Sequence, residues 1–191
     1  VSSDITGSTI TFNSDNAKKL DVKATSNHFI VDVAMGVGIA DDASVGAAVG
    51  GSFNTNTLKD TTSAKVTGTA VSKKEGAAND IDVNVAANTE SKIYNVAGEV
   101  GYSNSEKVAL GAGVAGNMDV LEQTVLAQIT GKSTLNGIKN AYVDSILKQH
   151  IRSCAVAGEI VSGDTAGFNI GGALGLELLK NKVSAILGGD S

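Results

Sequence analysis

Apolar and polar residues alternate with a period of two along several short stretches of this chain. Leu20, Val22 and Ala24 are separated by polar residues, and the same alternation returns at Ile81, Val83 and Val85 and around Lys65 and Gln128. Because successive side chains of a strand point to opposite faces, this pattern predicts half-buried β-strands. The stretches end in Gly, Asn, Asp, Ser or Thr, which suit turns.

Three similar copies of one sequence unit follow one another about sixty residues apart. VDVAMGVGIA begins at Val31, YNVAGEVGYS at Tyr94 and CAVAGEIVSG at Cys154. In each copy a block rich in Gly and Ala comes next (46–51, 111–116, 171–176), and a closing block ends the unit (64–68, 127–131, 185–189). Similar units in tandem bury their apolar sides against each other, so the repetition predicts a solenoid.

The expected fold is therefore all-β: a right-handed parallel β-helix that occupies residues 1–191 as a single solenoid segment of a longer passenger chain. The three repeats are placed at about 8–68, 69–131 and 132–191, with residues 1–7 finishing a preceding unit. A unit of this length is expected to make roughly three coils of about twenty residues each. Nine stacked coils at ~4.8 Å would form a rod ~43 Å long.

The third repeat also permits a helix. Val143, Ile146, Leu147, Ile151 and Cys154 are spaced as on one face of a helix. Stacked repeats must share one geometry, so the alignment with the two strand-like copies favours strands there as well.

Composition narrows the partners. The formal net charge is −5 and the pI near 4.9, and no basic cluster exceeds two residues, so neither nucleic acid nor an anionic membrane is expected to bind. Aromatic residues make up 4%, which favours a thin interior filled by Ala, Val, Ile and Leu. The chain contains no run of eighteen apolar residues, so the sequence predicts no membrane-spanning helix. Cys154, the single cysteine, excludes an internal disulfide and is expected to be a small core or half-buried residue.

No catalytic, cofactor-binding or metal-binding residues are expected, and no cofactor. His28 and His150 occupy similar places in two repeats, but no second ligand accompanies them in all three, which favours solvated turns over a metal site. Asp41-Asp42 and Asp80 to Asp82 could offer oxygens to calcium, yet the regular acidic array of calcium-binding repeats is absent, and Asx turns explain them better. GAGVAG at Gly111 to Gly116 matches a dinucleotide-binding loop, but such a loop must open a helix, and here the Gly-rich block recurs three times with different sequences that form helices poorly.

The unit as a whole resembles the long repeats of large secreted adhesins. The resemblance rests on the S-T-I-T-x-N opening at Ser8 to Asn13, the V-A-G-E segment, the G-A-x-V-G-G segment and the closing A-x-I-x-G, and it covers nearly the whole chain. Such repeats occur in autotransporter passengers and in haemagglutinin- and leukotoxin-like surface proteins of Gram-negative bacteria. The resemblance implies an extracellular chain at the outer-membrane surface, a translocator barrel elsewhere in the parent protein, a protein or glycan receptor on a host or neighbouring cell, and possible self-association.

The expected function is therefore a structural and adhesive segment of a secreted or surface-displayed bacterial adhesin, acting as a stalk or binding surface, and not an enzyme. The alternative is a β-helical carbohydrate-active enzyme, either a polysaccharide lyase or a glycosidase. Such an enzyme needs paired carboxylates beside aromatic rings that stack on sugars. The chain has no Trp, and Tyr94, Tyr102 and Tyr142 are not adjacent to acidic pairs in the sequence.

Overall fold

The chain folds into long parallel β-strands. The computed structural model describes residues 1–13, 18–76 and 80–188, and no helix occurs within these ranges. The helical alternative for the segment that starts at Val143 is therefore wrong, because this segment lies in strand β7 (Asn140–Gly163). Within the same ranges, no helix is available that could cross a membrane.

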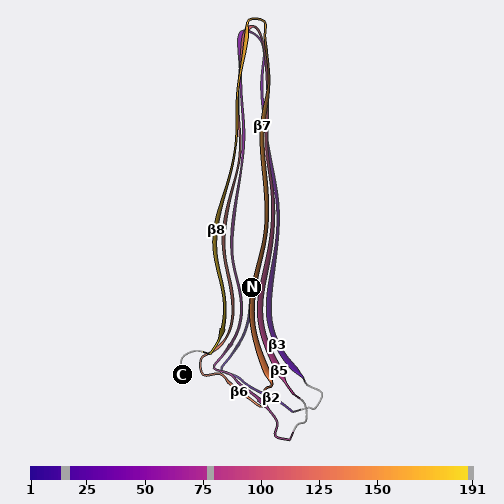
Figure 1. The fold of residues 1–191 in the computed structure, drawn as a ribbon, viewed down its shortest axis with the longest axis vertical. Coiled ribbons are helices and arrows are strands. Elements are labelled where there is room, and N and C mark those ends of the chain that lie inside the picture. Colours follow the sequence, from indigo (N-terminus) through magenta and orange to yellow (C-terminus); the bar gives the residue numbers. More distant parts are fainter. Residues whose placement is uncertain (14–17, 77–79, 189–191) are drawn as a thin grey trace.

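Two strands run the length of the molecule and back. Strand β3 (Lys19–Thr67) ascends, bends sharply at its far end and returns, and β5 (Asp82–Thr130) follows the same path beside it (Figure 1). β7 and β8 (Ala166–Leu187) make the third such path. We call each path a rung, its two halves the ascending and descending arms, the bend the tip and the opposite end the base.

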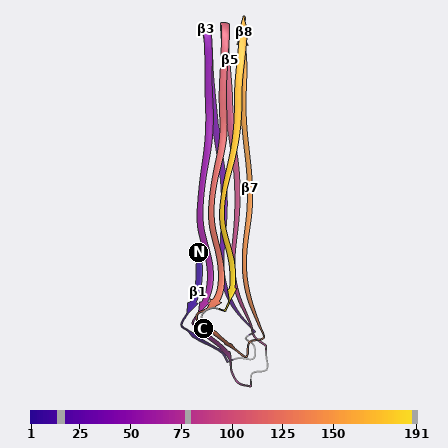
Figure 2. The ribbon, with the colours of Figure 1, turned by 60° about the vertical axis from the view of Figure 1, so that its left-hand side comes forward.

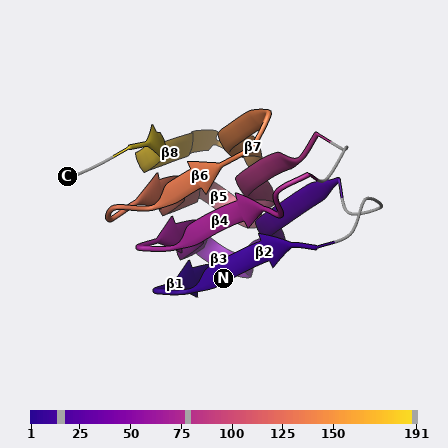
Figure 3. The same ribbon diagram turned by 90° about the horizontal axis from the view of Figure 1, so that it is seen from below.

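Four short strands lie at the base, as Figure 3 shows from below. β2 (Thr9–Phe12), β4 (Ala70–Lys73) and β6 (Thr134–Asn136) form a parallel three-stranded sheet. β1 (Ser2–Thr6) pairs with the last residues of the first descending arm, from Ser63 to Thr67. The N-terminus lies beside the arms in the lower half of the blade, and β8 ends towards the base (Figure 1).

Equivalent residues of successive rungs are direct neighbours. All pairing is parallel: Leu20 lies beside Val83, 63 residues later, and Val83 lies beside Ala141, 58 residues later. The expectation of about twenty residues per coil was wrong, since hydrogen-bonded partners are about sixty residues apart. The reason is that many Gly, Asn, Asp and Ser residues that favour turns lie inside the long arms.

The long axis of the molecule follows the strands rather than the direction of stacking. An arm such as Lys19 to Ala40 extends about 70 Å at ~3.3 Å per residue, whereas three rungs at ~4.8 Å make a stack only about 14 Å wide. Figure 2 shows this narrow profile. The chain is a thin two-layered blade, not a rod of nine coils.

The apolar core fills the half of the blade nearest the base. Inward-facing residues of both arms pack there, with Val83, Val85 and Val125 fully buried in the second rung. Val22, Ala24, Ala64, Val66, Val71, Ala87, Ala127 and Ile129 complete this cluster.

Glycine is needed where the arms approach each other and where the chain turns into the base. A Cβ on Gly38 would lie 2.7 Å from the carbonyl oxygen of Val49 on the opposite arm, so the first rung leaves no room for a side chain there. Gly68 and Gly131 have φ values of 57° and 67°, in the left-handed region that favours glycine, and each ends a descending arm. At these two glycines the chain turns from a descending arm into the base.

Candidate functional site

The outer faces of the blade change from polar to apolar halfway along the arms. In the first rung the outward residues Asp21, Lys23, Thr25 and Asn27 are followed by an apolar series that begins at Phe29. In the half of the ascending outer face nearest the tip, the exposed large hydrophobic residues are Phe29, Val31, Val33, Met35, Val37, Ile39, Val96, Val100, Tyr102, Val156 and Ile160. Nearer the base, Tyr142 and Ile146 of the third rung are exposed on the same face.

The descending outer face carries a matching apolar surface. Its exposed large hydrophobic residues are Val45, Val49, Phe53, Leu110, Val114, Phe168, Ile170, Leu174, Leu176 and Leu178. We call these two surfaces together the apolar band. Ala and Gly occupy most of the outward positions between the large side chains, and none of the outward positions that the structure describes from Val33 to Ile39 or from Val45 to Thr57 carries a charge. The band therefore covers both outer faces of the blade.

The alternation of apolar residues changes phase within one strand. In β3 the apolar positions are even at Leu20 and Val22, which face inward, and odd from Phe29 to Ile39, which face outward. Since the pleat points successive side chains to opposite faces, this change exchanges the apolar and polar sides of the sheet. The half of the blade nearest the base has an ordinary apolar core, whereas the half nearest the tip is apolar on the outside.

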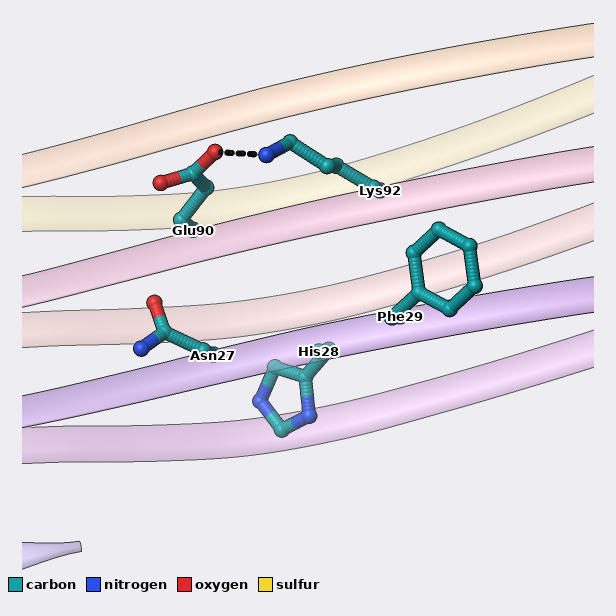
Figure 4. A pocket seen from close by; sticks show the side chains of 5 residues that line it. All are labelled: Asn27, His28, Phe29, Glu90 and Lys92. Carbon is teal, nitrogen blue, oxygen red and sulfur yellow. Dashed lines mark ion pairs between the residues drawn. The ribbon is translucent and has the colours of Figure 1, made fainter.

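Aromatic and cationic side chains mark the border of the band that faces the base. The rings of Phe29 and Tyr94 lie 5.8 Å apart between centroids, and the guanidinium of Arg152 lies 6.0 Å from the Tyr94 ring. Beside them, Lys92 and Glu90 form an ion pair of 2.7 Å at the edge of a shallow hollow (Figure 4). The hydrogen bond from Lys92 lowers the pKa of Glu90, and the same bond raises the pKa of Lys92.

The interior behind the band holds hydrogen-bonded polar side chains. Asp119 is fully buried and accepts hydrogen bonds from one residue of each rung: Asn56 at 3.1 Å, Asn95 at 2.5 Å and Ser153 at 3.3 Å. Gln123 similarly donates to Ser91 at 2.8 Å. Buried polar groups are tolerated when they are paired in this way, so the network holds the two arms and the three rungs together.

Ser26, His28 and Asp60 form a second cluster, in the first rung between the polar and apolar halves. Nε2 of His28 lies 2.9 Å from Oγ of Ser26 and 3.0 Å from Oδ2 of Asp60. A serine relay needs the carboxylate on the other ring nitrogen, Nδ1, so this geometry does not activate the serine. Burial by itself would raise the pKa of Asp60, but hydrogen bonds from His28, Ser26 and Thr62 outweigh burial and lower it. The cluster links the ascending and descending arms of the first rung.

Two carboxylates lie inside the blade near the tip. Glu99 is 2% exposed, and neither its oxygens nor those of Glu159 have a hydrogen-bond partner among the described residues. Glycine makes room for them: a Cβ at Gly113 would be 2.6 Å from Cδ of Glu99 and 2.9 Å from Oε1 of Glu159. Gly50 confines Glu99 from another side. The V-A-G-E segments and the Gly-rich segments of the sequence are thus facing parts of one narrow slot.

The two histidines and Cys154 do not lie where the sequence predicts them. His28 pairs with Ser91, whereas His150 pairs with Lys92, so the two histidines are one position out of step and face opposite ways. Both lie in strands rather than turns. Cys154 is exposed on the outer face beside Val96, so the expectation of a core or half-buried cysteine was wrong.

The acidic residues considered for calcium and the Gly111 to Gly116 loop lie in ordinary structural positions. Asp41 accepts a hydrogen bond of 3.0 Å from Asn104 at the tip, and Asp80 pairs with Lys139 at 2.8 Å at the base. The side chain of Asp42 lies outside the described residues. Gly111 to Gly116 is part of strand β5 and opens no helix. Among the residues that the structure describes, no group of three or more His, Cys, Asp or Glu side chains could hold a metal ion.

Sequence reasoning missed the apolar band, although the signal was present in the change of phase between Ala24 and Phe29. Comparisons with protein-family models, with curated proteins and with solved structures found no match.

Proposed function

We propose that this chain is a structural and adhesive segment of a secreted or surface-displayed bacterial adhesin, and that its apolar band is the contact surface. The observation that carries the proposal is the exposure of large hydrophobic side chains on both faces, for example 75% for Met35 and Val49 and 74% for Ile170. Extended exposed apolar surfaces of this kind are rare unless they bind something.

The interior supports a structural role. Asp119, behind the band, is hydrogen-bonded to the opposite arm and to the neighbouring rungs, which stiffens the thin blade while its outside is apolar. A rigid surface loses little conformational entropy on binding and is suited to display. We propose further that the rungs are coils of a right-handed parallel β-helix, in which the base forms the stem and the blade projects sideways.

A carbohydrate-active enzyme receives less support. Glu99 and Glu159 lie close to each other, but they are enclosed between glycines and cannot reach a sugar chain. The ring of Phe29 is exposed and that of Tyr94 is half-buried; Glu90 beside them is held by Lys92, and Glu177 lines a hollow together with Tyr94. No paired, accessible carboxylates flank an aromatic surface among the described residues, and such a pair is what glycoside hydrolysis requires.

Adhesion of whole cells to the immobilised chain tests this proposal. Beads coated with the chain are offered to epithelial cells and to bacteria, and attached cells are counted under flow. Val33→Lys places a charge in the band, and Thr25→Lys places the same charge eight residues earlier on the outer face of the same arm; both side chains are exposed.

We expect the wild-type chain and Thr25→Lys to hold cells and Val33→Lys to hold several-fold fewer. Circular dichroism of each variant confirms that the strands are retained. Attachment no greater than that of albumin-coated beads, or equal loss in both variants, would overturn an adhesive role for the band.

A further inference from the structure

We infer that the partner of the apolar band is a lipid bilayer, into which the half of the blade nearest the tip inserts. This inference rests on the proposed function, because it assigns a partner to the same surface.

The band faces two opposite directions. A protein partner or a second copy docked on one outer face would leave the other face in water. Acyl chains surround an inserted object and cover both faces at once.

The dimensions of the band agree with those of a bilayer. From Phe29 to Ile39 the outward apolar series extends about 33 Å at ~3.3 Å per residue, and the hydrocarbon core of a bilayer is ~30 Å thick. Polar residues follow at the tip, including Asp41, Glu106 and Lys107. Polar residues therefore bound the band at both ends, and the length between them matches the thickness of a hydrocarbon layer.

Aromatic residues lie at both limits of the band. Phe29 and Tyr94 are in contact at the limit nearer the base, and Tyr102 and Phe168 are exposed near the tip, while Phe53 is exposed between these limits. Aromatic rings gather at the two interfaces of strands that cross membranes.

The charges at the limit nearer the base complement anionic headgroups. Lys92 and Arg152 lie on the ascending outer face, and Lys59 and Lys180 lie on the descending one at a similar height. Glu90 and Glu122 are their only acidic neighbours recorded in ion pairs among the described residues. The net charge of −5 thus conceals a local belt of cations around the blade.

The polar interior is also what insertion requires. Asp119, Asn95 and Gln123 are hidden between the arms and hydrogen-bonded there. The outer faces of the inserted half carry the exposed hydroxyls of Thr55 and Thr57, and Glu177 is exposed at the open side of the third rung. The backbone edges of the first and third rungs need partners in lipid. In-register pairing of a third rung with the first rung of another blade supplies them, because β1 covers the first rung only from Ser63 to Thr67. Insertion is therefore expected to be accompanied by association.

Cys154 provides a direct test, because this only cysteine is exposed on the band. The full chain is labelled there with an environment-sensitive fluorophore and mixed with vesicles of phosphatidylcholine, with and without phosphatidylglycerol. Quenching by nitroxide-labelled acyl chains is compared with quenching by iodide in the buffer. The matched control carries Cys154→Ser and Thr25→Cys, which moves the label to the polar half.

We expect the Cys154 label to shift to the blue, to be quenched by the acyl-chain nitroxides and to be protected from iodide, while the control label stays accessible to iodide. Phosphatidylglycerol should raise the bound fraction, and salt should lower it. Val33→Lys should reduce partitioning at least tenfold relative to Thr25→Lys, since a charge in the hydrocarbon core is costly.

No bound fraction at millimolar lipid, equal shifts of both labels, or continued access of iodide to the Cys154 label would overturn the inference. Adhesion of cells without any binding to vesicles would leave the adhesive function standing with a protein or glycan receptor. Insertion into vesicles without adhesion of cells would support the lipid bilayer as partner and overturn the adhesive function.

Discussion

Nδ2 of Asn95 donates a hydrogen bond of 2.5 Å to Oδ2 of Asp119, and the two residues come from opposite arms of the same rung. This bond crosses the interior at the height where the outside of the blade becomes apolar. Near this bond the polar network holds the two arms together, as the apolar core does nearer the base.

Replacing Asn95 should therefore cost stability. Asn95→Ala leaves the fully buried Asp119 with two donors in place of three, and the loss of a hydrogen-bond partner by a buried polar group costs about 1–3 kcal/mol of the free energy of unfolding. Urea denaturation followed by circular dichroism measures the loss. Asn84→Ala, which removes an exposed bond to Asp21, is the control and should change the stability by less than about 0.5 kcal/mol. Equal effects of the two substitutions would contradict a structural role for the network.

Stability should fall in acid partly through Asp60. The pKa of this carboxyl is lowered in the folded chain, so its contribution is complete above the unfolded-state pKa of about 3.9 and is lost as the pH falls through the lower folded-state value. Asp60→Asn removes this contribution, and its stability should depend less steeply on pH between about pH 5 and pH 2. Denaturant titrations at several pH values measure both slopes. Parallel curves for the two chains would show that Asp60 is not held by His28 in solution.

Gly113 should not tolerate a side chain while Glu99 is present. Gly113→Ala places a methyl group against the carboxylates of Glu99 and Glu159, and overpacking of this kind costs about 1–3 kcal/mol. Gly98→Ala, where nothing lies within 4 Å of the new carbon, should be nearly neutral.

A double substitution separates this collision from a general intolerance of alanine. If the carboxylate is the obstacle, Gly113→Ala should be less harmful in a Glu99→Ala background, with a coupling energy of about 1 kcal/mol or more in a double-mutant cycle. Additive effects would place Glu99 elsewhere than in the glycine slot.

The thiol of Cys154 should react while the chain is folded. Its side chain is exposed, so a soluble disulfide reagent should modify it as fast in buffer as in denaturant, within about tenfold. The absorbance of the released thiolate gives both rates. Protection by several orders of magnitude in buffer would place this residue inside the blade, as its small apolar neighbours in the sequence had suggested.

Much of the fold is readable from the chain, and the exceptions have physical causes. Alternation at Leu20, Val22 and Ala24 predicts strands, and strands are found there; the parallel pairing of all rungs agrees with the repetition of the blocks. The number of coils was not readable, because a glycine such as Gly38, which usually indicates a turn, lies in an arm where two backbones meet. The helical spacing after Val143 did not produce a helix, because the neighbouring strand β5 pairs with that segment along its whole length.

The register itself was nearly but not fully readable. Block similarity aligns Leu20 with Ile81, whereas the structure pairs Leu20 with Val83. A shift of two residues keeps each side chain on its own face, so the inward series was correctly identified despite it. The odd shift between His28 and His150 did change faces, and only the pairing of the strands reveals it.

The unequal spacing of the rungs shows where the chain tolerates insertions and deletions. Both arms keep the same offset between the second and third rungs, 58 residues for Val83 and Ala141 and again for Val108 and Ala166, although the preceding offset is 63. The missing five residues are all taken from the connection at the base, between Thr130 and Asn140. Loss or gain of codons between the end of β6 at Asn136 and Asn140 leaves every ladder aligned. A single codon added within an arm would instead move every later side chain of that arm to the opposite face.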